Sequence, residues 1–398
     1  MRALCTVRDP TCISRLAPGL TTNPLFKAFK NCWIFSLVAI VSHLPIHRAR
    51  ITTYVARIHA KMLFSTVLST YLAAGALATS PQIRTLGQLA IGTWLENIVM
   101  RPNGAILTTQ LLSQSNVWTV RRPESRHTCL KLVTSLPDSN AAVGITRVND
   151  IGGLETYVVL GGNFTDGESP HPGEYTAFAL QFLDKHSDKF KLKKIAALGP
   201  SSVSANGITS SDEYPGVVFV ADSFAGLVGR LDVSAGHFQQ GVWAYKELKA
   251  PPGFRTGVNG VKIYKSHLYW TNSDLVAIYK VPLTKSGWAV PNAVPQLVAN
   301  LSSVATIVDD FVIDHQGNIY SATNLDNTVI FSDTKTGKSK IVAGGLKDFI
   351  LQGVGALAIG RETRGEIVLY GATSGGLERP IDGITEGAKV SSIILKTG

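Results

Sequence analysis

Four polar residues stand directly in front of apolar, strand-like runs that are far apart in the chain. They are Glu96 in ENIVM, Asn206 in NGIT, Asn259 in NGVKI and Asp309 in DDFVI. Two carboxylates and two amides, with no histidine or cysteine among them, offer the oxygen ligands that a hard divalent cation such as Ca²⁺ prefers. The alternative is that these side chains hydrogen-bond only water and loop backbone. The cation site requires a fold that brings the four segments to one place.

The elements around these residues recur along the chain. Short β-rich runs alternate with clusters of Gly, Asn, Asp, Ser and Pro, and helical periodicity is almost absent, which is typical of an all-β protein. Six units share the pattern of an apolar strand, a turn and a second apolar strand. Their first apolar residues are Ile98, Ile145, Ile208, Val261, Phe311 and Ala356, at steps of 47, 63, 53, 50 and 45 residues. Steps of this size suit a four-stranded propeller blade.

We therefore predict an all-β fold, a six-bladed β-propeller that forms one domain over residues 79–398. The end segments 82–91 and 389–398 lie outside the six units. In a closed ring, one of them would complete the blade that the other begins. A β-sandwich is the alternative fold.

The propeller predicts where the four polar residues lie. The first strand of each blade lines the central channel, so residues that precede those strands meet at one mouth. We expect Gly207 and Gly260 to let the backbone bend sharply into the channel. The ends of the second strands should reach the same mouth and contribute Phe224, Trp270 and Asn272. Aromatic walls with a few hydrogen-bonding groups favour a small organic ligand over a polymer.

The first 78 residues differ from the rest. Residues 62–78 form an apolar stretch that ends in Ala-Leu-Ala, the pattern of a cleaved secretory signal peptide. Residues 1–61 are a basic, irregular leader, and we expect translation of the natural product to begin at Met62. The alternative is a membrane anchor around residues 32–44, a run that is short for a membrane span.

Charge and cysteine content also separate the two parts. The whole chain has a net charge of +10, but residues 79–398 contain 29 Lys and Arg against 27 Asp and Glu. No basic surface for nucleic acid or anionic membranes is therefore expected. Three of the four cysteines lie in the leader, which leaves Cys129 and no internal disulfide. Sequons at Asn163 and Asn300 fit a secreted glycoprotein.

Four stretches carry a resemblance to a known family: ENIVMRPNGAILTT, NGIT…VVFVADS, NGVKI…LYWTNS and DDFVIDHQGNIYSAT. They are similar to the senescence-marker-protein/gluconolactonase family of six-bladed propellers, and especially to its secreted fungal branch, over residues 92–398. The resemblance implies that Glu96, Asn206 and Asp309 bind a divalent cation, and that Asp309 is the candidate base for lactone hydrolysis. In one departure, Asp310 stands where the family has glycine. In another, the arginines expected to bind a sugar lactone are not evident.

The fungal branch includes hetero-Diels–Alderases of tropolone sesquiterpenoid biosynthesis. The resemblance therefore implies a cyclase that joins a polyketide-derived tropolone quinone methide to an apolar humulenol-type sesquiterpene. Such a reaction depends on holding two partners in a near-attack arrangement, here among Phe224, Trp270, Asn272 and Asp309. A calcium-dependent lactonase or ester hydrolase is one alternative, and a non-catalytic binding propeller is another. The expected partners are small molecules, with no nucleic acid and no membrane after signal cleavage.

Overall fold

The computed structural model describes residues 80–112, 114–165, 169–185 and 188–396. The expected leader and signal peptide, at residues 1–61 and 62–78, lie outside the described residues. Within the described ranges, no helix is long and apolar enough to cross a membrane.

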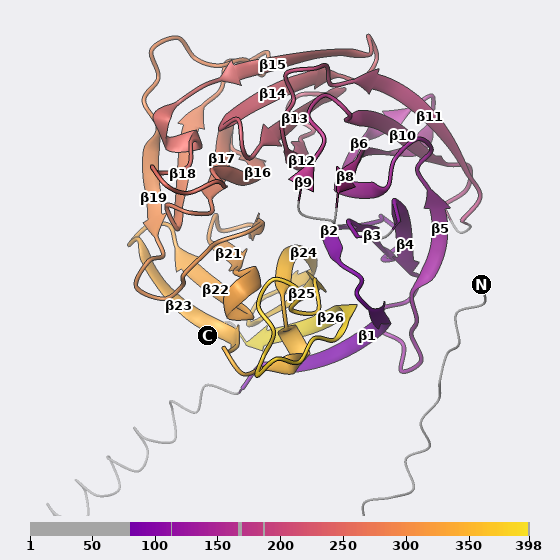
Figure 1. Cartoon of the computed structure of the whole chain (residues 1–398), viewed down its shortest axis with the longest axis vertical. Coiled ribbons are helices and arrows are strands. Elements are labelled where there is room, and N and C mark those ends of the chain that lie inside the picture. Colours follow the sequence, from indigo (N-terminus) through magenta and orange to yellow (C-terminus); the bar gives the residue numbers. More distant parts are fainter. Residues whose placement is uncertain (1–79, 113, 166–168, 186–187, 397–398) are drawn as a thin grey trace, which may run out of the picture. The chain divides into compact units, whose positions relative to one another are not determined.

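The described residues form six antiparallel four-stranded sheets arranged around a central axis, so the predicted six-bladed propeller is confirmed (Figure 1). Blade one contains β2 (Leu95–Met100), β3 (Ile106–Gln110), β4 (Asn116–Val120) and β5 (Lys131–Ser135). Blade two contains β6 (Ala141–Ile151), β7 (Leu154–Gly162), β10 (Thr176–Phe182) and β11 (Phe190–Ala197). Blade three contains β12 (Ala205–Ser210), β13 (Val217–Asp222), β14 (Leu227–Asp232) and β15 (His237–Trp243).

The remaining three blades close the ring. Blade four contains β16 (Val258–Tyr264), β17 (His267–Asn272), β18 (Ala277–Pro282) and β19 (Gln296–Asn300). Blade five contains β20 (Phe311–Ile313), β21 (Ile319–Ala322), β22 (Thr328–Asp333) and β23 (Lys338–Gly344). Blade six contains β24 (Val354–Thr363), β25 (Glu366–Thr373), β26 (Gly387–Lys396) and β1 (Gln82–Ile91). The first strand of the domain, β1, pairs antiparallel with the last, β26, from Gln82 opposite Ile394 onward. The predicted joining of the two end segments is confirmed, and it protects edges that would otherwise be exposed.

A break in strand pairing recurs where the inner strands meet the channel mouth. In blade one, pairing passes from Leu95 directly to Ile98, and the inner strands of blades two, three and four skip the equivalent two residues. Residues in such a bulge leave the regular alternation of the ladder, which re-aims their side chains. The breaks in blades one, three and four contain Glu96, Asn206 and Asn259, respectively.

The glycines in these breaks lie close to the next blade. Gly207 and Gly260 do not have the left-handed backbone found at many other glycines of this chain. Instead, a Cβ on Gly207 would lie 2.4 Å from the carbonyl oxygen of Asn259, and one on Gly260 would lie 2.3 Å from Oδ1 of Asp310. Glycine is needed because neighbouring inner strands approach closely at the axis, a reason that the sequence did not reveal.

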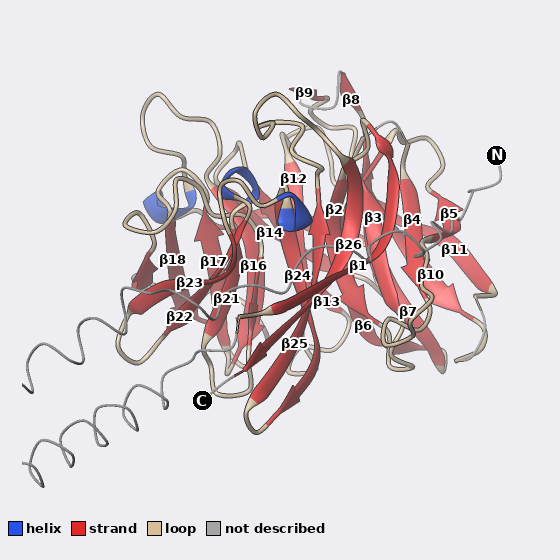
Figure 2. Ribbon diagram, turned by 90° about the horizontal axis from the view of Figure 1, so that it is seen from below, coloured by secondary structure: helices blue, strands red, loops and turns tan. Residues whose placement is uncertain are grey.

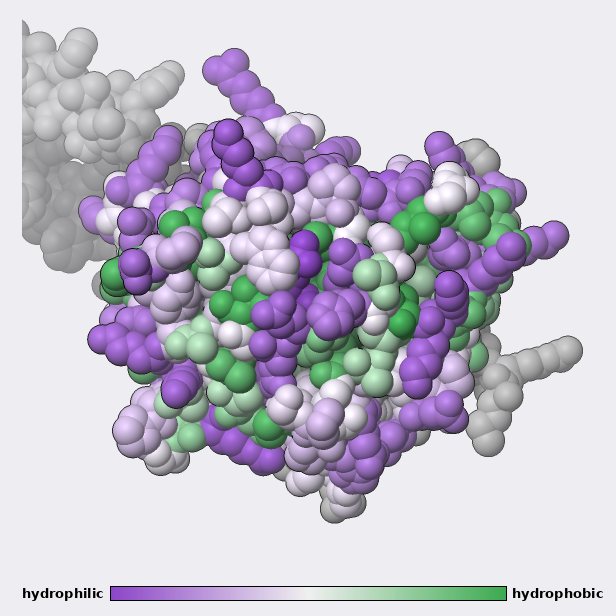
Figure 3. All heavy atoms as spheres, turned by 90° about the horizontal axis from the view of Figure 1, so that it is seen from above, coloured by the Kyte–Doolittle hydropathy of each residue, from purple (hydrophilic) through white to green (hydrophobic). Residues whose placement is uncertain are grey.

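The hydrophobic core lies between adjacent blades. One cluster joins blades three and four through Phe219, Trp243, Val261 and Trp270. The outer side of the ring shown in Figure 3 carries hydrophobic side chains in small groups separated by hydrophilic ones. The blades are therefore held together by several separate apolar clusters in the interior, formed where neighbouring blades meet.

The connections at one end of the propeller are longer than a simple hairpin turn. They contain the 3₁₀ helices η2 (Lys246–Leu248), η3 (Asn324–Asp326) and η4 (Phe349–Leu351), and the short strands β8 (Phe164–Thr165) and β9 (Ser169–Pro170). Figure 2 shows these elements along the same edge of the molecule. This is the end at which the inner strands begin, and we call it the mouth face.

Candidate active site

Two buried carboxyl groups lie close together at the mouth face. Glu96, at the start of β2, is 9% exposed, and Asp309, just before β20, is 8% exposed. Neither forms an ion pair with a lysine, arginine or histidine in the part of the chain that the structure describes. Blades one and five thus bring two acids, separated by more than two hundred residues in sequence, to one place.

Burial and mutual repulsion disfavour the ionised form of both acids. Burial, followed by the nearby charge of Glu378, raises the pKa of Glu96 to about 7, although a hydrogen bond from the Trp94 side chain opposes this. Burial and then the charge of Glu96 raise the pKa of Asp309 well above its usual range, against a hydrogen bond from Asn259. Carboxyl groups shifted in this way are common at functional sites.

The two predicted amides come from the neighbouring blades. Asn259 is 7% exposed, and its Nδ2 lies 3.1 Å from Oγ of Ser273 while the side chain also hydrogen-bonds Asp309. Asn206 is half-buried one blade further round, with the backbone of Gly207 packed against the carbonyl of Asn259. The structure therefore brings Glu96, Asn259 and Asp309 together and places Asn206 on the adjoining strand.

A polar layer crosses the channel directly beneath the acids. Nδ2 of Asn97 in blade one donates to Oδ2 of Asp310 in blade five at 3.2 Å. Nζ of Lys262 in blade four contacts Oδ1 of Asp310 at 2.5 Å. Asp310 is thus a bridge across the axis, and it forms an ion pair with Lys262.

Below this layer the channel continues as a mostly apolar cavity of about 280 Å³, lined in part by Ile98, Ile145 and Ile208. The Asn97–Asp310–Lys262 layer separates that space from the mouth. A ligand at the mouth therefore meets the carboxyl groups and amides rather than the lower channel.

The chemistry of the donors fits a hard cation. Glu96 and Asp309 supply charge, and Asn206 and Asn259 supply amide oxygens. No lysine, arginine or histidine of the described residues forms an ion pair with either acid. A bound Ca²⁺ would neutralise the acids and could polarise a substrate carbonyl. No group of three or more His, Cys, Asp or Glu within the described residues has the geometry of a metal site, so amides are needed to complete any such set.

Glu378 is a mouth residue that the sequence reasoning missed. It lies in the β25–β26 connection, where its carboxylate accepts a hydrogen bond from Nδ2 of Asn324 at 3.1 Å. Its charge raises the pKa of both Glu96 and Asp309. Nothing in the repeat pattern marks Glu378, because it lies in the long connection between β25 and β26, outside the recurring strand pairs.

Trp270 is not in the wall of the mouth. Its side chain has no exposed surface, lies between the rings of Tyr245 and Tyr279 at centroid distances of 6.4 and 5.7 Å, and donates to the carbonyl of Glu247. The alternation of β17 points this ring into the space between blades three and four. The expectation that Trp270 contacts a ligand is therefore corrected: the residue is part of the core.

Asn272 also has a structural position. It is fully buried, and its Nδ2 donates to the carbonyls of Glu247 and Lys249 at 3.0 and 2.8 Å. Its Oδ1 accepts from the backbone N–H of Leu275 at 3.1 Å. Because all of its polar atoms are engaged in holding the connection before β16, the expectation that it contacts a ligand is also corrected.

Phe224 does reach the mouth face. It lies in the β13–β14 connection and is partly exposed, with the Arg255 guanidinium 4.0 Å from the centre of its ring. This cation–π contact holds one face of the ring. Of the three wall residues expected from the sequence, Phe224 is the one with surface available on the mouth face.

The two sequons have different surroundings. Nδ2 of Asn163 donates to Glu174 at 3.0 Å, and Oδ1 accepts from the backbone N–H of Asn140 at 2.9 Å. Asn300 is exposed at the end of β19, and its Oδ1 accepts from both the N–H and the hydroxyl of Ser302. Attachment of a glycan would therefore disrupt more at Asn163 than at Asn300.

Comparison with known proteins gives the fold and geometry a context. No family model matches the chain. It is 29% identical over 310 residues to a protein of Phoma sp named "Putative hetero-Diels-Alderase", an alignment that covers 72% of this chain and 85% of that one. It is 27% identical over 241 residues to "Putative hetero-Diels-Alderase asR5" of Sarocladium schorii, with 56% and 58% covered. The chain is a relative of both proteins.

Solved structures with a similar fold include three propellers. A luciferin-regenerating enzyme matches with a TM-score of 0.54 at 12% identity, over 80% of this chain and 98% of its own. The calcium-binding protein regucalcin from Agrobacterium tumefaciens gives 0.53 at 14%, over 80% and 95%. A "putative gluconolactonase" gives 0.50 at 15%, over 79% and 92%. The expected likeness to gluconolactonase-type propellers is confirmed at the level of the fold.

Proposed function

We propose that this protein is a hetero-Diels–Alderase of fungal secondary metabolism. The observation that carries the proposal is its similarity to two curated proteins that both bear this name. The substrates we propose are a tropolone quinone methide, as the oxygen-containing diene, and a humulenol-type sesquiterpene alkene. Three π bonds become one π bond, one C–C bond and one C–O bond, and no atom or proton leaves.

The arrangement at the mouth face suits such a reaction. Catalysis consists mainly of holding the two partners in a near-attack geometry, which can contribute roughly 7–11 kcal/mol. The amide of Asn206, which is half-buried at the mouth face, can donate a hydrogen bond to the quinone-methide oxygen as negative charge develops on it. Partly exposed apolar groups such as Phe224 can contact the terpene.

A lactonase or ester hydrolase is the second candidate, and the buried acids favour it. Glu96 and Asp309 lie together in a fold shared with regucalcin and a "putative gluconolactonase". With a cation held by these residues, Asp309 would activate water while the metal polarises the carbonyl. For this candidate we propose Ca²⁺ as the cofactor, because the donors are all oxygen atoms.

One substitution separates the two candidates. Asp309→Asn keeps the size of the side chain and one oxygen ligand but removes the base. Cyclisation should largely survive this change, whereas lactone hydrolysis should fall by about 10²–10⁴-fold. Asp212→Asn is a matched control, since Asp212 is exposed in the turn at the opposite end of β12.

The assay is incubation of purified protein with a quinone-methide precursor and humulenol, followed by chiral analysis of the adducts. If the wild type and both variants, Asp309→Asn and Asp212→Asn, form a single enantiomer of the adduct, the result supports the cyclase. Turnover abolished in Asp309→Asn but retained in Asp212→Asn contradicts it. Binding of both partners with only the background rate and racemic product would instead indicate a non-catalytic binding propeller.

We also propose that the protein is secreted and glycosylated. The signal-peptide pattern at residues 62–78 and the two sequons support this proposal. The mature N-terminus should lie near Thr79. Mass spectrometry of protein secreted by a fungal host tests this, and a secreted chain that retains residues 1–61 would refute it.

A further inference from the structure

A second cavity lies far from the buried acids. It has a volume of about 810 Å³ and sits between blades five and six, at the end of the propeller opposite the mouth face. Its lining comes from the β20–β21 and β24–β25 turns and from strands β21 to β26. This volume is within the range of small-molecule sites in proteins.

The inner wall of the cavity is apolar and partly aromatic. Tyr320 and Phe331 meet at a centroid distance of 5.3 Å, and Val342, Ile367 and Leu395 complete the surface. Tyr320, Ile367 and Leu395 are each less than a tenth exposed. Phe331 and Val342 are partly exposed, so a flat organic molecule would bury apolar surface chiefly against these two side chains, which is favourable in water.

The acids at this cavity are already engaged. Asp314 accepts hydrogen bonds from the backbone N–H groups of Gln316 and Asn318 at 2.9 and 2.7 Å, so it caps its own turn. Glu362 pairs with His315. Among the described residues neither acid forms an ion pair with Lys340 or Arg364. Burial, followed by the charges of both acids, raises the pKa of Tyr320.

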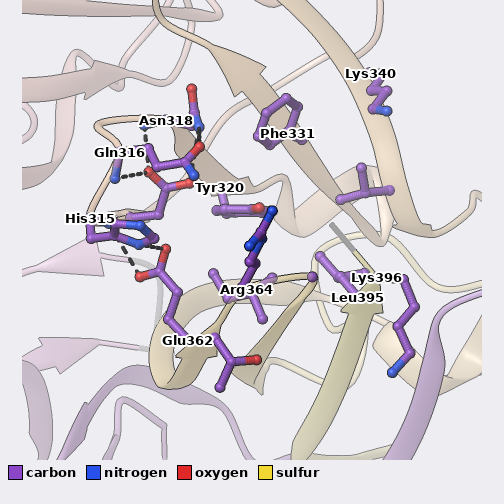
Figure 4. Close-up of a pocket in the computed structure, with 15 residues that line it drawn as sticks. His315, Gln316, Asn318, Tyr320, Phe331, Lys340, Glu362, Arg364, Leu395 and Lys396 are labelled. Carbon is purple, nitrogen blue, oxygen red and sulfur yellow. Dashed lines mark hydrogen bonds and ion pairs between the residues drawn. The ribbon is translucent and has the colours of Figure 1, made fainter. Parts of the chain in front are cut away.

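Two basic groups of the rim form no ion pair with a carboxylate of the described residues. Lys340, on β23, contacts the Phe331 ring with its Nζ 5.8 Å from the centroid, and forms no ion pair with any described acid. Arg364, in the β24–β25 turn, likewise forms none within the described ranges. Figure 4 shows the Arg364 side chain extending from its turn toward Tyr320, in the middle of the group. Lys396, by contrast, is paired with Glu366.

We propose that this cavity binds a small amphipathic organic anion, with its flat apolar body against Phe331 and Val342 and its acidic group between Lys340 and Arg364. The apolar wall supplies affinity, and these two cations select negative charge by charge-assisted hydrogen bonds. The site is separate from the mouth face and is independent of the cyclase proposal.

Two fluorescent probes of similar shape test the proposal. Anilinonaphthalene sulfonate carries the required negative charge, and N-phenylnaphthylamine is its neutral counterpart. The wild-type chain should bind the sulfonate more tightly, and added salt should weaken that binding because the cations are exposed. The double variant Lys340→Gln/Arg364→Gln should weaken sulfonate binding by about tenfold or more and leave the neutral probe unaffected.

Lys338→Gln is the matched control, because Lys338 is an exposed lysine on the same strand that does not line the cavity. It should bind both probes as the wild type does. Unchanged melting temperatures show that the variants are folded. Equal sulfonate affinity in wild type and double variant would overturn the proposal, as would an equal loss in the Lys338→Gln control or for the neutral probe.

Discussion

Replacement of Glu96 by glutamine should stabilise the metal-free protein at alkaline pH. Glu96 is a buried acid next to Asp309 and Glu378, with no cationic side chain paired with it among the described residues. Glutamine has nearly the same shape and can still accept the hydrogen bond from Trp94. The change therefore removes a charge and leaves the packing intact.

The size of the effect follows from the pKa. Burial and neighbouring charges raise the pKa of Glu96 from 4.5 to about 7, and each pKa unit corresponds to about 1.4 kcal/mol. A raised carboxyl pKa means that the folded state binds the proton more tightly than the unfolded state. Its contribution to stability is full below pH 4.5 and is lost as the pH rises through about 7. At pH values above about 8, Glu96→Gln should therefore exceed the wild type by about 3 kcal/mol.

Thermal unfolding in the presence of a chelator measures this difference. For a domain of about 320 residues, 3 kcal/mol corresponds to roughly 4–5 °C in Tm. The variant should melt higher than the wild type at pH 8 and equally near pH 4.5. Addition of Ca²⁺ at pH 8 should raise the Tm of the wild type, since an ion that binds the folded state stabilises it, and Asp309→Ala should lose this response.

A surface acid provides a control of opposite sign. Hydrogen bonds from Lys396 and Arg361 lower the pKa of Glu366, so its stabilising effect is present at neutral pH and is lost as the pH falls. Glu366→Gln should therefore lower the Tm at pH 8. A Glu96→Gln variant that is equally or less stable than the wild type at pH 8 with chelator would refute the reasoning about the buried acids. An unchanged wild-type Tm with calcium and with chelator would refute the cation site.

Three further results are expected. Lys262→Met should cost about 3–5 kcal/mol in urea unfolding, because Asp310 is left buried without its cation, and adding Asp310→Asn should recover most of the loss. Trp270→Ala should destabilise the protein by about 3–5 kcal/mol through a cavity between blades; an intact Tm with altered stereoselectivity would contradict its place in the core. Glycopeptide mass spectrometry of secreted protein should find Asn300 occupied and Asn163 largely free, and the reverse pattern would contradict the structural ranking.

The sequence by itself determined the architecture. Six recurrent strand pairs, begun at residues such as Ile98 and Phe311, were enough to predict the number of blades, and the strand-like ends 82–91 and 389–398 predicted how the ring closes. These features are readable because alternation along a strand and the spacing of repeats are local properties of the chain. The polar residues before the inner strands could be found for the same reason.

The tertiary structure decided which side chains share a space. Glycine at 207 and 260 reflects contacts with the next blade, which no local pattern reveals. Trp270 and Asp310 could be read from the sequence as a wall residue and a substituted glycine, and the fold makes them a core residue and a bridge across the axis. Glu378 reaches the acids only through a long connection. The burial and the pKa of the acids at the axis depend on side chains from different blades. These side chains come close to one another only when the ring has closed.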